Sequence, residues 1–232
     1  MVSESVFVGE NCCFASNFDF VYQNIFKYKT TIYLKMGNIT QNWVDLLFPF
    51  TKNYFGKYSG TQLAKKTGIP QQTASRYLKE LEKSNLIEFE KVGRNKLYYF
   101  NFNKLTSKSI IRLLEESKTI DFLKKQKDIS PVIKELKDYT ETIIVFGSYS
   151  SYKQTKHSDL DVVLIKTDKD LLRQTKDRSV VEINEHVVSY KEFEEEIKSE
   201  NPLALEILSN HTIIGNMTKM ADMIIASGKW KR

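Results

Sequence analysis

The chain has 232 residues, of which 41% are hydrophobic and 28% are charged, and its formal net charge is +6. This length holds one large domain or two small ones, and the hydrophobic content is enough for a packed core, which argues against a disordered chain. The positive charge favours polyanionic partners.

The chain has two cysteines, the neighbours Cys12 and Cys13. Adjacent cysteines rarely bridge each other, and no further thiols or histidines nearby indicate a zinc site, so we expect a reducing, cytoplasmic setting. No stretch is long and apolar enough to span a bilayer, and the N-terminus lacks the basic-then-apolar layout of a secretory signal. A membrane is therefore not among the expected partners.

The first 35 residues differ from the rest of the chain. Residues 1–35 are rich in Phe, Tyr, Asn and Ser and show neither a helical nor a strand period. We expect either that Met36 is the natural start or that residues 1–35 form a loosely packed extension.

Residues 36–102 show three helical patterns followed by a hairpin. Thr40 can cap a helix over 41–50, and a short helix over 62–66 is followed by a turn in which Gly68 supplies the tight bend. A longer helix over 71–84 buries apolar residues at helical spacing. The two strands beyond it alternate around Val92-Gly93-Arg94-Asn95, and Lys91, Arg94 and Lys96 lie at the hairpin tip.

The stretch GTQLAKKTGIPQQTASRYLKELEKSNLIEFEKVGRNKLYYF resembles the winged helix-turn-helix of bacterial and archaeal transcription regulators. The resemblance implies that the 71–84 helix enters the major groove of double-stranded DNA and that the hairpin contacts the backbone. An alternative use of such a domain is protein contact or dimer formation. The expected DNA-binding residues are Gln71, Gln72, Thr73, Arg76, Lys79 and Arg94.

Residues 103–139 read as a charged helical linker. Apolar residues recur near helical spacing over 110–123, and Pro131 opens a second helix. We expect this linker to pack against both halves of the chain or to form a homodimer contact.

The most informative segment is IIVFGSYSSYKQTKHSDLDVVLI, residues 143–165. An apolar strand ends at Gly147-Ser148, and Asp159 and Asp161 lead into a second strand. Alternation places both carboxylates on one strand face, where they repel each other unless a cation lies between them. Gly147 lets a phosphate approach the backbone, and Ser148 opens a short helix whose free N–H groups would face an anion.

This segment resembles the minimal nucleotidyltransferases of the DNA polymerase β superfamily, whose signature is G-S-x10-D-x-D. The matching residues are Gly147, Ser148, Asp159 and Asp161. The resemblance implies Mg²⁺ held by Asp159 and Asp161 and phosphates of an NTP held at Gly147 and Ser148. Family members often carry small-Arg-Gly shortly after G-S, where this chain has Ser150-Ser151-Tyr152. Lys153, Lys156 or His157 could replace the missing arginine's charge, with a poorer geometric match to a phosphate.

The superfamily also implies a third carboxylate on a later strand, expected here over 180–188. Glu182 is our choice for that catalytic role, because it lies between two core-type residues on the face shared with Asn184 and His186. Asn184 could instead take the position, which would leave two acids. Glu185 would have to emerge from the apolar face.

The sequence therefore predicts an α+β chain: a winged helix-turn-helix, a helical linker, and a polymerase β-like nucleotidyltransferase domain over 140–232 with a small mixed sheet flanked by helices. The expected reaction is Mg²⁺-dependent transfer of a nucleoside monophosphate from NTP to an acceptor, with loss of pyrophosphate. The acceptor stays open among a partner protein, a small molecule and an RNA end. The alternative is a regulator whose nucleotidyltransferase-like half senses nucleotide, or binds a partner, without turnover.

Overall fold

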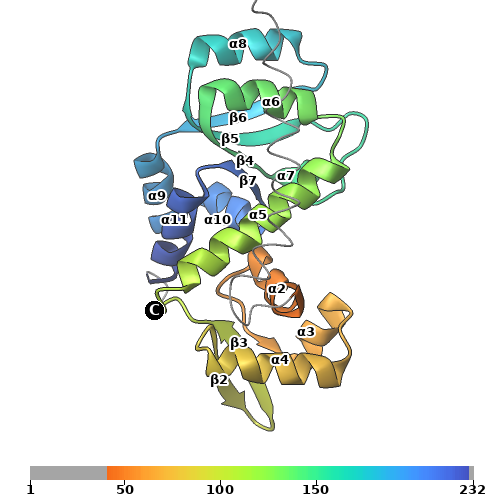
Figure 1. Cartoon of the computed structure of the whole chain (residues 1–232). Coiled ribbons are helices and arrows are strands. Elements are labelled where there is room, and N and C mark those ends of the chain that lie inside the picture. Colours follow the sequence, from red (N-terminus) through yellow and green to blue (C-terminus); the bar gives the residue numbers. More distant parts are fainter. Residues whose placement is uncertain (1–40, 230–232) are drawn as a thin grey trace, which may run out of the picture. The chain divides into compact units, whose positions relative to one another are not determined.

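The computed structural model describes residues 41–229, with two small sheets and helices in a mixed α+β arrangement (Figure 1). Backbone contacts divide the chain into the units Met1–Gln41 and Asn42–Arg232. The predictions for residues 1–35, for the start at Met36 and for the cap at Thr40 lie outside the described residues. Within residues 41–229, no helix is both long enough and apolar enough to cross a membrane.

The first sheet has the strand order β1-β3-β2, and α3 and α4 contact it. The expected helix over 41–50 ends at Leu47 and continues as a 3₁₀ turn, in which Pro49 lacks the N–H that an α-helix would need. The elements are α2 (Gln41–Leu47), η1 (Phe48–Lys52), β1 (Tyr58–Ser59), α3 (Gly60–Thr67), α4 (Gln71–Lys83), β2 (Ile87–Val92) and β3 (Asn95–Phe100).

Local chemistry fixes the helix-turn-helix. The Ser59 hydroxyl accepts the N–H of Gln62, and the Gln62 side chain accepts the N–H of Ser59, so a capping box starts α3. Gly68 ends α3 at φ +71°, the left-handed conformation expected of the tight bend. Pro70 then precedes α4. The predicted turn is confirmed.

An aromatic cluster holds the first sheet against the helical segment before it. The Phe100 ring lies edge-on to Phe50 at 6.2 Å and to Tyr54 at 5.9 Å between ring centroids, and Phe50 meets Tyr58 at 5.1 Å. Such edge-to-face pairs contribute beyond the burial of their area. Tyr54 therefore belongs to the core of the winged-helix part.

Two helices connect the sheets, as the linker prediction expected: α5 (Ser107–Lys125) and α6 (Ser130–Tyr139). Pro131 lies in the first turn of α6. α5 contacts η1 on one side and both β7 (Thr212–Gly215) and α11 (Met217–Lys229) on the other. The linker thus packs against both halves, and the homodimer contact stays a prediction.

The second sheet has the strand order β6-β5-β4-β7. β4 pairs antiparallel with β5 and β7, whereas β5 and β6 run parallel. The remaining elements of this half are β4 (Thr140–Val145), α7 (Gly147–Ser150), β5 (Leu160–Thr167), α8 (Lys169–Arg178), β6 (Ile183–Val188), α9 (Tyr190–Lys198) and α10 (Pro202–Ser209).

One face of the second sheet is covered by α6 and α8, which lie beside each other over it in Figure 1. Leu160, Val162 and Leu164 of β5 point into this apolar core with Ile133 and Leu172 from the two helices. Because strand side chains alternate, Asp161 lies on the other face. The core therefore fixes the direction in which that carboxylate projects.

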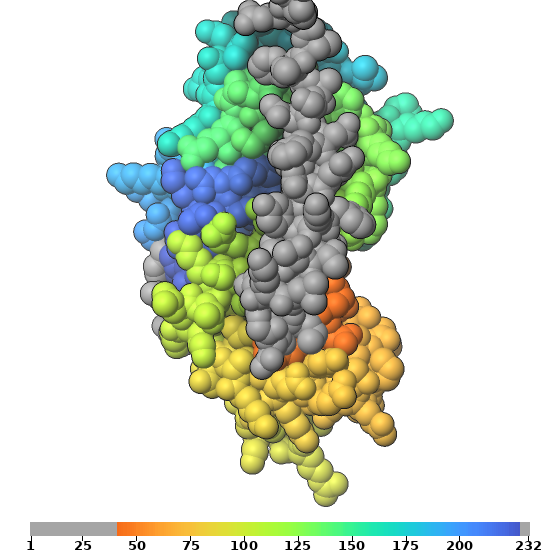
Figure 2. Space-filling model, viewed as in Figure 1, coloured from red at the N-terminus to blue at the C-terminus, as the bar shows by residue number. Residues whose placement is uncertain are grey.

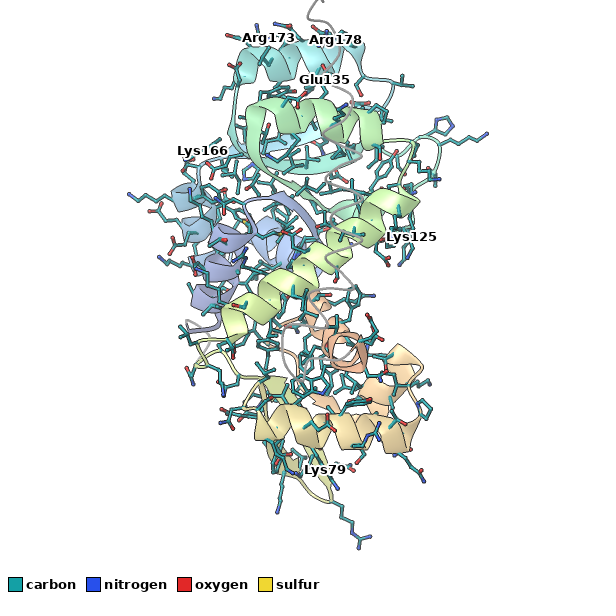
Figure 3. The ribbon with its side chains drawn as sticks, in the orientation of Figure 1. Lys79, Lys125, Glu135, Lys166, Arg173 and Arg178 are labelled. Atoms are coloured by element: carbon teal, nitrogen blue, oxygen red, sulfur yellow. The ribbon has the colours of Figure 1, made fainter. Side chains whose placement is uncertain are left out.

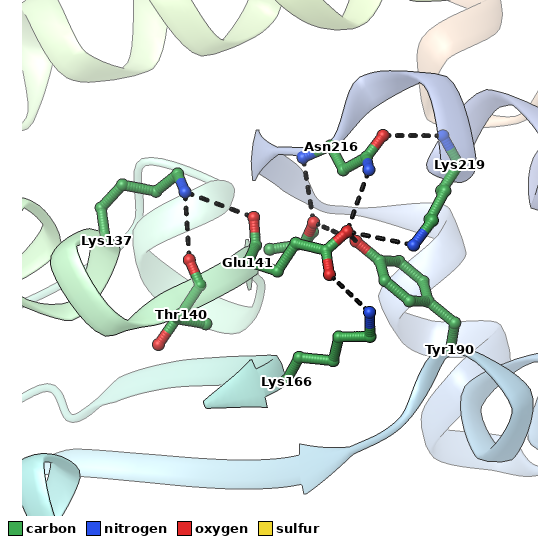
Figure 4. Close-up of polar contacts among 8 residues, drawn as sticks. Lys137, Thr140, Glu141, Lys166, Tyr190, Asn216 and Lys219 are labelled. Carbon is green, nitrogen blue, oxygen red and sulfur yellow. Dashed lines mark hydrogen bonds and ion pairs between the residues drawn. The ribbon is translucent and has the colours of Figure 1, made fainter. Parts of the chain in front are cut away.

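A cluster of polar side chains lies near the start of β4, at the opposite end of that strand from Gly147 (Figure 4). Glu141 forms ion pairs with Lys166 at 2.9 Å and Lys219 at 3.1 Å and accepts a hydrogen bond from Asn216 at 3.0 Å. Hydrogen bonds from these groups, with that from Lys166 the largest, hold the pKa of the Glu141 carboxyl at about 2. Lys166 reaches Glu141 from a left-handed conformation, φ +54°, near the end of β5. This cluster joins β4, β5 and α11.

Candidate functional site

The bend after β4 lies directly against the Asp161 side chain. Gly147 has φ +64°, and a Cβ built on it would lie 2.3 Å from Asp161 Oδ2 and 3.2 Å from Asp161 Cγ. The Phe146 N–H also donates to the Asp161 carbonyl at 3.1 Å. The Gly-Ser bend and the second aspartate of the motif are therefore neighbours, and a side chain at position 147 would displace the Asp161 carboxylate.

Ser148 lies in the single turn of α7, and an ordered loop leads from there to Asp159. The Lys153 N–H donates to the Ser148 carbonyl at 2.9 Å, and the Ser158 hydroxyl accepts the Thr155 N–H at 2.8 Å. Lys153, Lys156 and His157 are exposed in this loop. The exposed lysines of this loop therefore lie close in sequence to the Gly-Ser bend.

Tyr152 occupies the position where the resembled family carries glycine. Its backbone has φ +57°, the left-handed region that a non-glycine residue adopts at a cost. The Tyr152 ring lies 6.4 Å from the Phe122 ring and 5.0 Å from Lys125 Nζ, at the C-terminal end of α5 labelled in Figure 3. The backbone of Tyr152 thus has a conformation suited to glycine, and its ring contacts α5.

The strand beside β5 contributes an amide next to Asp161. The register pairs Asp161 with Asn184, and Asn184 Nδ2 donates to Asp161 Oδ1 at 3.0 Å. Glu182 is exposed just ahead of β6, and its carbonyl accepts the Leu160 N–H at 2.8 Å, so its backbone lies beside the start of β5. Glu185 pairs with Lys176 of α8. The neighbour of the second aspartate is therefore an amide.

Asp159 is exposed and Asp161 is half-buried. Within residues 41–229, neither carboxylate forms an ion pair with a Lys, Arg or His side chain, although Asp161 Oδ1 accepts the Asn184 amide. Two carboxylates suit Mg²⁺, which prefers oxygen ligands and keeps several waters. In the same part of the chain, no group of three or more Asp, Glu, His or Cys residues is placed to hold a metal ion.

Sequence reasoning missed Asn210. This residue follows α10, and its Nδ2 donates to the Gly147 carbonyl at 3.2 Å across 63 positions of the chain. Its neighbour Thr212 lies 3.4 Å from Ser150, hydroxyl to hydroxyl. Nothing in the local pattern of 201–215 marks a contact with the bend, because the contact depends on how β7 pairs with β4.

The predicted DNA-contacting residues of α4 share its outer side. Gln71, Gln72, Arg76 and Lys79 are exposed, Thr73 is half-buried, and Lys79 points away from the helix (Figure 3). Arg76 lies over the Tyr77 ring at 4.8 Å, and the inner side of α4 buries Ala74, Leu78 and Leu81. α4 thus presents a polar, basic face of the kind that reads groove edges and phosphates.

The hairpin tip projects as the yellow-green point of the surface in Figure 2. Gly93, at φ +60°, and Arg94 form its two-residue turn, and Lys91 and Arg94 are exposed. Lys96 pairs with Glu82 of α4 at 3.1 Å and lies over the Phe89 ring, so it joins the hairpin to the helix rather than standing at the tip. The free charges of the wing are those of Lys91 and Arg94.

Comparisons with known proteins agree with this geometry in one part of the chain. Residues 56–88 match a family described as winged helix-turn-helix DNA-binding. No curated protein and no solved structure matches the chain. The matched segment contains β1, α3, α4 and the start of β2, with the helices that sequence reasoning assigned to the same motif. Residues 56–88 are thus a winged helix-turn-helix DNA-binding segment.

Proposed function

We propose that this protein combines duplex DNA binding with nucleotidyl transfer. The winged helix binds DNA, and the half of the chain from residue 140 transfers a nucleoside monophosphate from NTP to an acceptor. The observation that carries the second part is the contact between the Gly147 backbone and the Asp161 carboxylate, where a Cβ would be 2.3 Å from Oδ2. A phosphate bound at Gly147 would lie beside an acid able to hold its metal ion. A small mixed sheet flanked by helices is also the arrangement that the nucleotidyltransferase resemblance implies.

The residues take separate roles in this proposal. Asp159 and Asp161 would hold Mg²⁺, which neutralises charge developing on the transferred phosphoryl group and the pyrophosphate. The missing side chain of Gly147 leaves room for the Asp161 carboxylate, so a phosphate bound to the Gly147 backbone would lie beside that acid. Ser148 offers a hydroxyl and an N–H, and Lys153 and Lys156 supply positive charge in place of the absent arginine. Most of the rate comes from positioning and charge neutralisation.

Glu182 is the proposed group that helps to deprotonate the acceptor hydroxyl. Its position beside the start of β5 places it at the same end of the sheet as Asp159. Proton transfer to a positioned carboxylate contributes about 10²–10⁴-fold to a rate. Glu182→Gln should therefore lower the turnover number while leaving NTP affinity nearly unchanged.

A second candidate function is favoured by Asn184. Its amide donates to Asp161 Oδ1, so this neighbour of the aspartate pair brings no charge. A site with two carboxylates binds a divalent cation with nucleotide less strongly than a site with three, and it lacks one acid for catalysis. In this second candidate, the half of the chain from residue 140 senses nucleotide or binds a partner without turnover.

Nucleotidyl transfer is tested by incubating the protein with each labelled NTP, Mg²⁺ and candidate acceptors and measuring pyrophosphate. Asp159→Ala and Asp161→Ala should abolish product, whereas Asp177→Ala, at an exposed position of α8, should not. Pyrophosphate release unaffected by both motif variants would reject the assignment of the site.

Turnover by the native protein distinguishes the two candidates, and Asn184→Asp tests whether the amide beside Asp161 limits metal binding. If the native site is a sensor, the native protein binds NTP with Mg²⁺ without turnover, and the added carboxylate strengthens binding of Mn²⁺ measured by electron paramagnetic resonance. If the native site is catalytic, pyrophosphate appears with Asn184 in place. If the native protein does not bind NTP, both candidates are rejected.

A further inference from the structure

A buried polar contact joins the core of the winged-helix part to α5. The Tyr54 hydroxyl donates to Glu115 Oε1 at 2.8 Å, and the two residues are 4% and 2% exposed. Tyr54 packs its ring on Phe100 of β3, and Glu115 lies in the middle of α5. A buried hydrogen bond to a carboxylate is costly to break, because the carboxylate would then lack a partner.

Glu115 also faces His211, the residue just before β7. Its Oε2 lies 3.3 Å from His211 Nε2, and Lys118 Nζ lies 3.9 Å from the same oxygen. Burial raises the pKa of Glu115, but Lys118, His211 and the Tyr54 hydroxyl outweigh it and hold this pKa at about 2. Glu115 is therefore ionised, and it connects Tyr54 on one side with His211 on the other.

The His211 ring meets acceptors at both nitrogens. Nδ1 lies 3.1 Å from the Ile207 carbonyl and 3.2 Å from the Leu208 carbonyl, at the end of α10, while Nε2 faces Glu115. His211 is 2% exposed, so these contacts are shielded from water. His211 thereby ties the end of α10 to α5.

The residues on either side of His211 contact the candidate nucleotide site. Asn210 donates to the Gly147 carbonyl at 3.2 Å, and Thr212 meets Ser150 of α7 at 3.4 Å. On the other side of the same segment, Thr119 of α5 donates to the Ile213 carbonyl. Residues 210–213 therefore have direct contacts with both the Gly-Ser bend and α5.

We propose that residues 210–213 couple nucleotide binding at Gly147 to DNA binding by the winged helix, through the contacts Tyr54–Glu115–His211. This inference depends on nucleotide binding at the Gly147–Asp161 site. A nucleotide that moves the Gly147 carbonyl moves Asn210 with it, and the neighbouring His211 cannot shift without disturbing its buried 3.3 Å contact with Glu115. The disturbance then reaches Tyr54 in the winged-helix core.

The surroundings give this segment room for a second arrangement. A pocket of about 170 Å³ lies beside it, lined by Tyr54, Phe55, Leu205, Leu208 and His211 among others. Buried polar networks favour discrete arrangements, because partly broken contacts leave unpaired groups. Coupling of this kind changes affinity by about 5–150-fold in other proteins, and the effect is reciprocal.

The test measures the dissociation constant of a labelled DNA duplex with and without a saturating non-hydrolysable NTP analogue and Mg²⁺. Direct titration of the analogue without DNA establishes nucleotide binding separately. We expect the analogue to change DNA affinity at least about fivefold, and DNA to change analogue affinity by the same factor.

Tyr54→Phe is the decisive variant, since it removes the hydroxyl that reaches Glu115 and keeps the ring that packs on Phe100. Its change in DNA affinity on adding the analogue should fall below about twofold, with analogue affinity in the absence of DNA unchanged. Tyr99→Phe is the matched control, because the Tyr99 hydroxyl donates to Glu88 at 3.0 Å within the winged-helix sheet. It should keep the full change.

His211→Gln tests the same coupling from the other end and should also reduce the change. An analogue that binds but leaves DNA affinity unchanged would overturn the coupling and leave the proposed function standing. If the Tyr54→Phe protein keeps the full change in DNA affinity, the coupling is also overturned and the proposed function still stands. An analogue that does not bind in the direct titration would reject the proposed function and the coupling together.

Discussion

Replacing Gly147 by alanine tests the geometry on which the nucleotide site depends. The substitution has two consequences that can be separated. An L-residue at φ +64° costs about 1–2 kcal/mol in backbone strain. The new Cβ would also be 2.3 Å from Asp161 Oδ2, so the carboxylate must move by about 0.7 Å or more to restore a separation of 3.0 Å.

The collision itself should cost little stability, since the Asp161 carboxylate is the end of a side chain. Its effect on binding should be larger, because the displaced oxygens lose both their hydrogen bond from Asn184 and their place in the site. We expect binding of NTP with Mg²⁺ to weaken about 10–100-fold, the range found when groups that orient metal ligands are changed.

Gly93→Ala supplies the matched control. Gly93 has φ +60°, and a Cβ built there meets nothing within 4 Å, so this variant carries the same strain without the collision. Both variants should lower the midpoint of thermal unfolding by a few degrees, at about 2–4 °C per kcal/mol for a chain of this size. Only Gly147→Ala should lose nucleotide affinity in a calorimetric titration. Equal nucleotide affinity in the two variants would refute the reasoning.

Further predictions concern DNA binding, a helix cap and one buried acid. Arg76→Ala and Arg94→Ala should each weaken binding to duplex DNA and reduce the slope of log affinity against log salt by about one, while Arg173→Ala on α8 changes neither, as measured by fluorescence anisotropy. Ser59→Ala should lower the free energy of unfolding in urea by about 1 kcal/mol through loss of the capping box, and an unchanged midpoint would contradict that role. The pKa of Glu115 is lowered from 4.5 to about 2, so its contribution of about 3 kcal/mol is present above pH 4.5 and is lost as the pH falls towards 2. Glu115→Gln should accordingly destabilise the protein at pH 7 much more than at pH 2, and equal losses at both values would contradict the assignment.

The parts of the fold that the sequence predicted have local causes. The turn at Gly68, the hairpin around Val92-Gly93-Arg94-Asn95 and the apolar strands around the Gly-Ser bend follow from backbone preferences and alternation. The pairing of Val92 with Asn95 shortens the predicted turn to Gly93-Arg94. α9 likewise has a local start signal, because Ser189 and Glu192 form a capping box. The ends of strands are harder to predict. β4 begins at Thr140, ahead of the apolar run that starts at Ile143, because Thr140 pairs with Thr167 of β5.

The features that could not be predicted depend on contacts between distant segments. Asn210 contacts Gly147 only because β7 pairs with β4. In the sequence, Glu115 has the pattern of an exposed charged residue on an amphipathic helix. The Asn184 alternative was recognised from strand alternation, yet its hydrogen bond to Asp161 required the parallel register of β5 and β6. Periodicity identifies the face of a strand, whereas register decides which side chains meet.

The contact between Gly147 and Asp161 has an evolutionary consequence. While the acid remains at position 161, selection should remove every side chain at position 147, however mild its effect on folding. Among descendants of this chain, a substitution at 147 should accompany or follow loss of the acid at 161. Lineages in which both positions have changed would be those that lack the proposed nucleotide site.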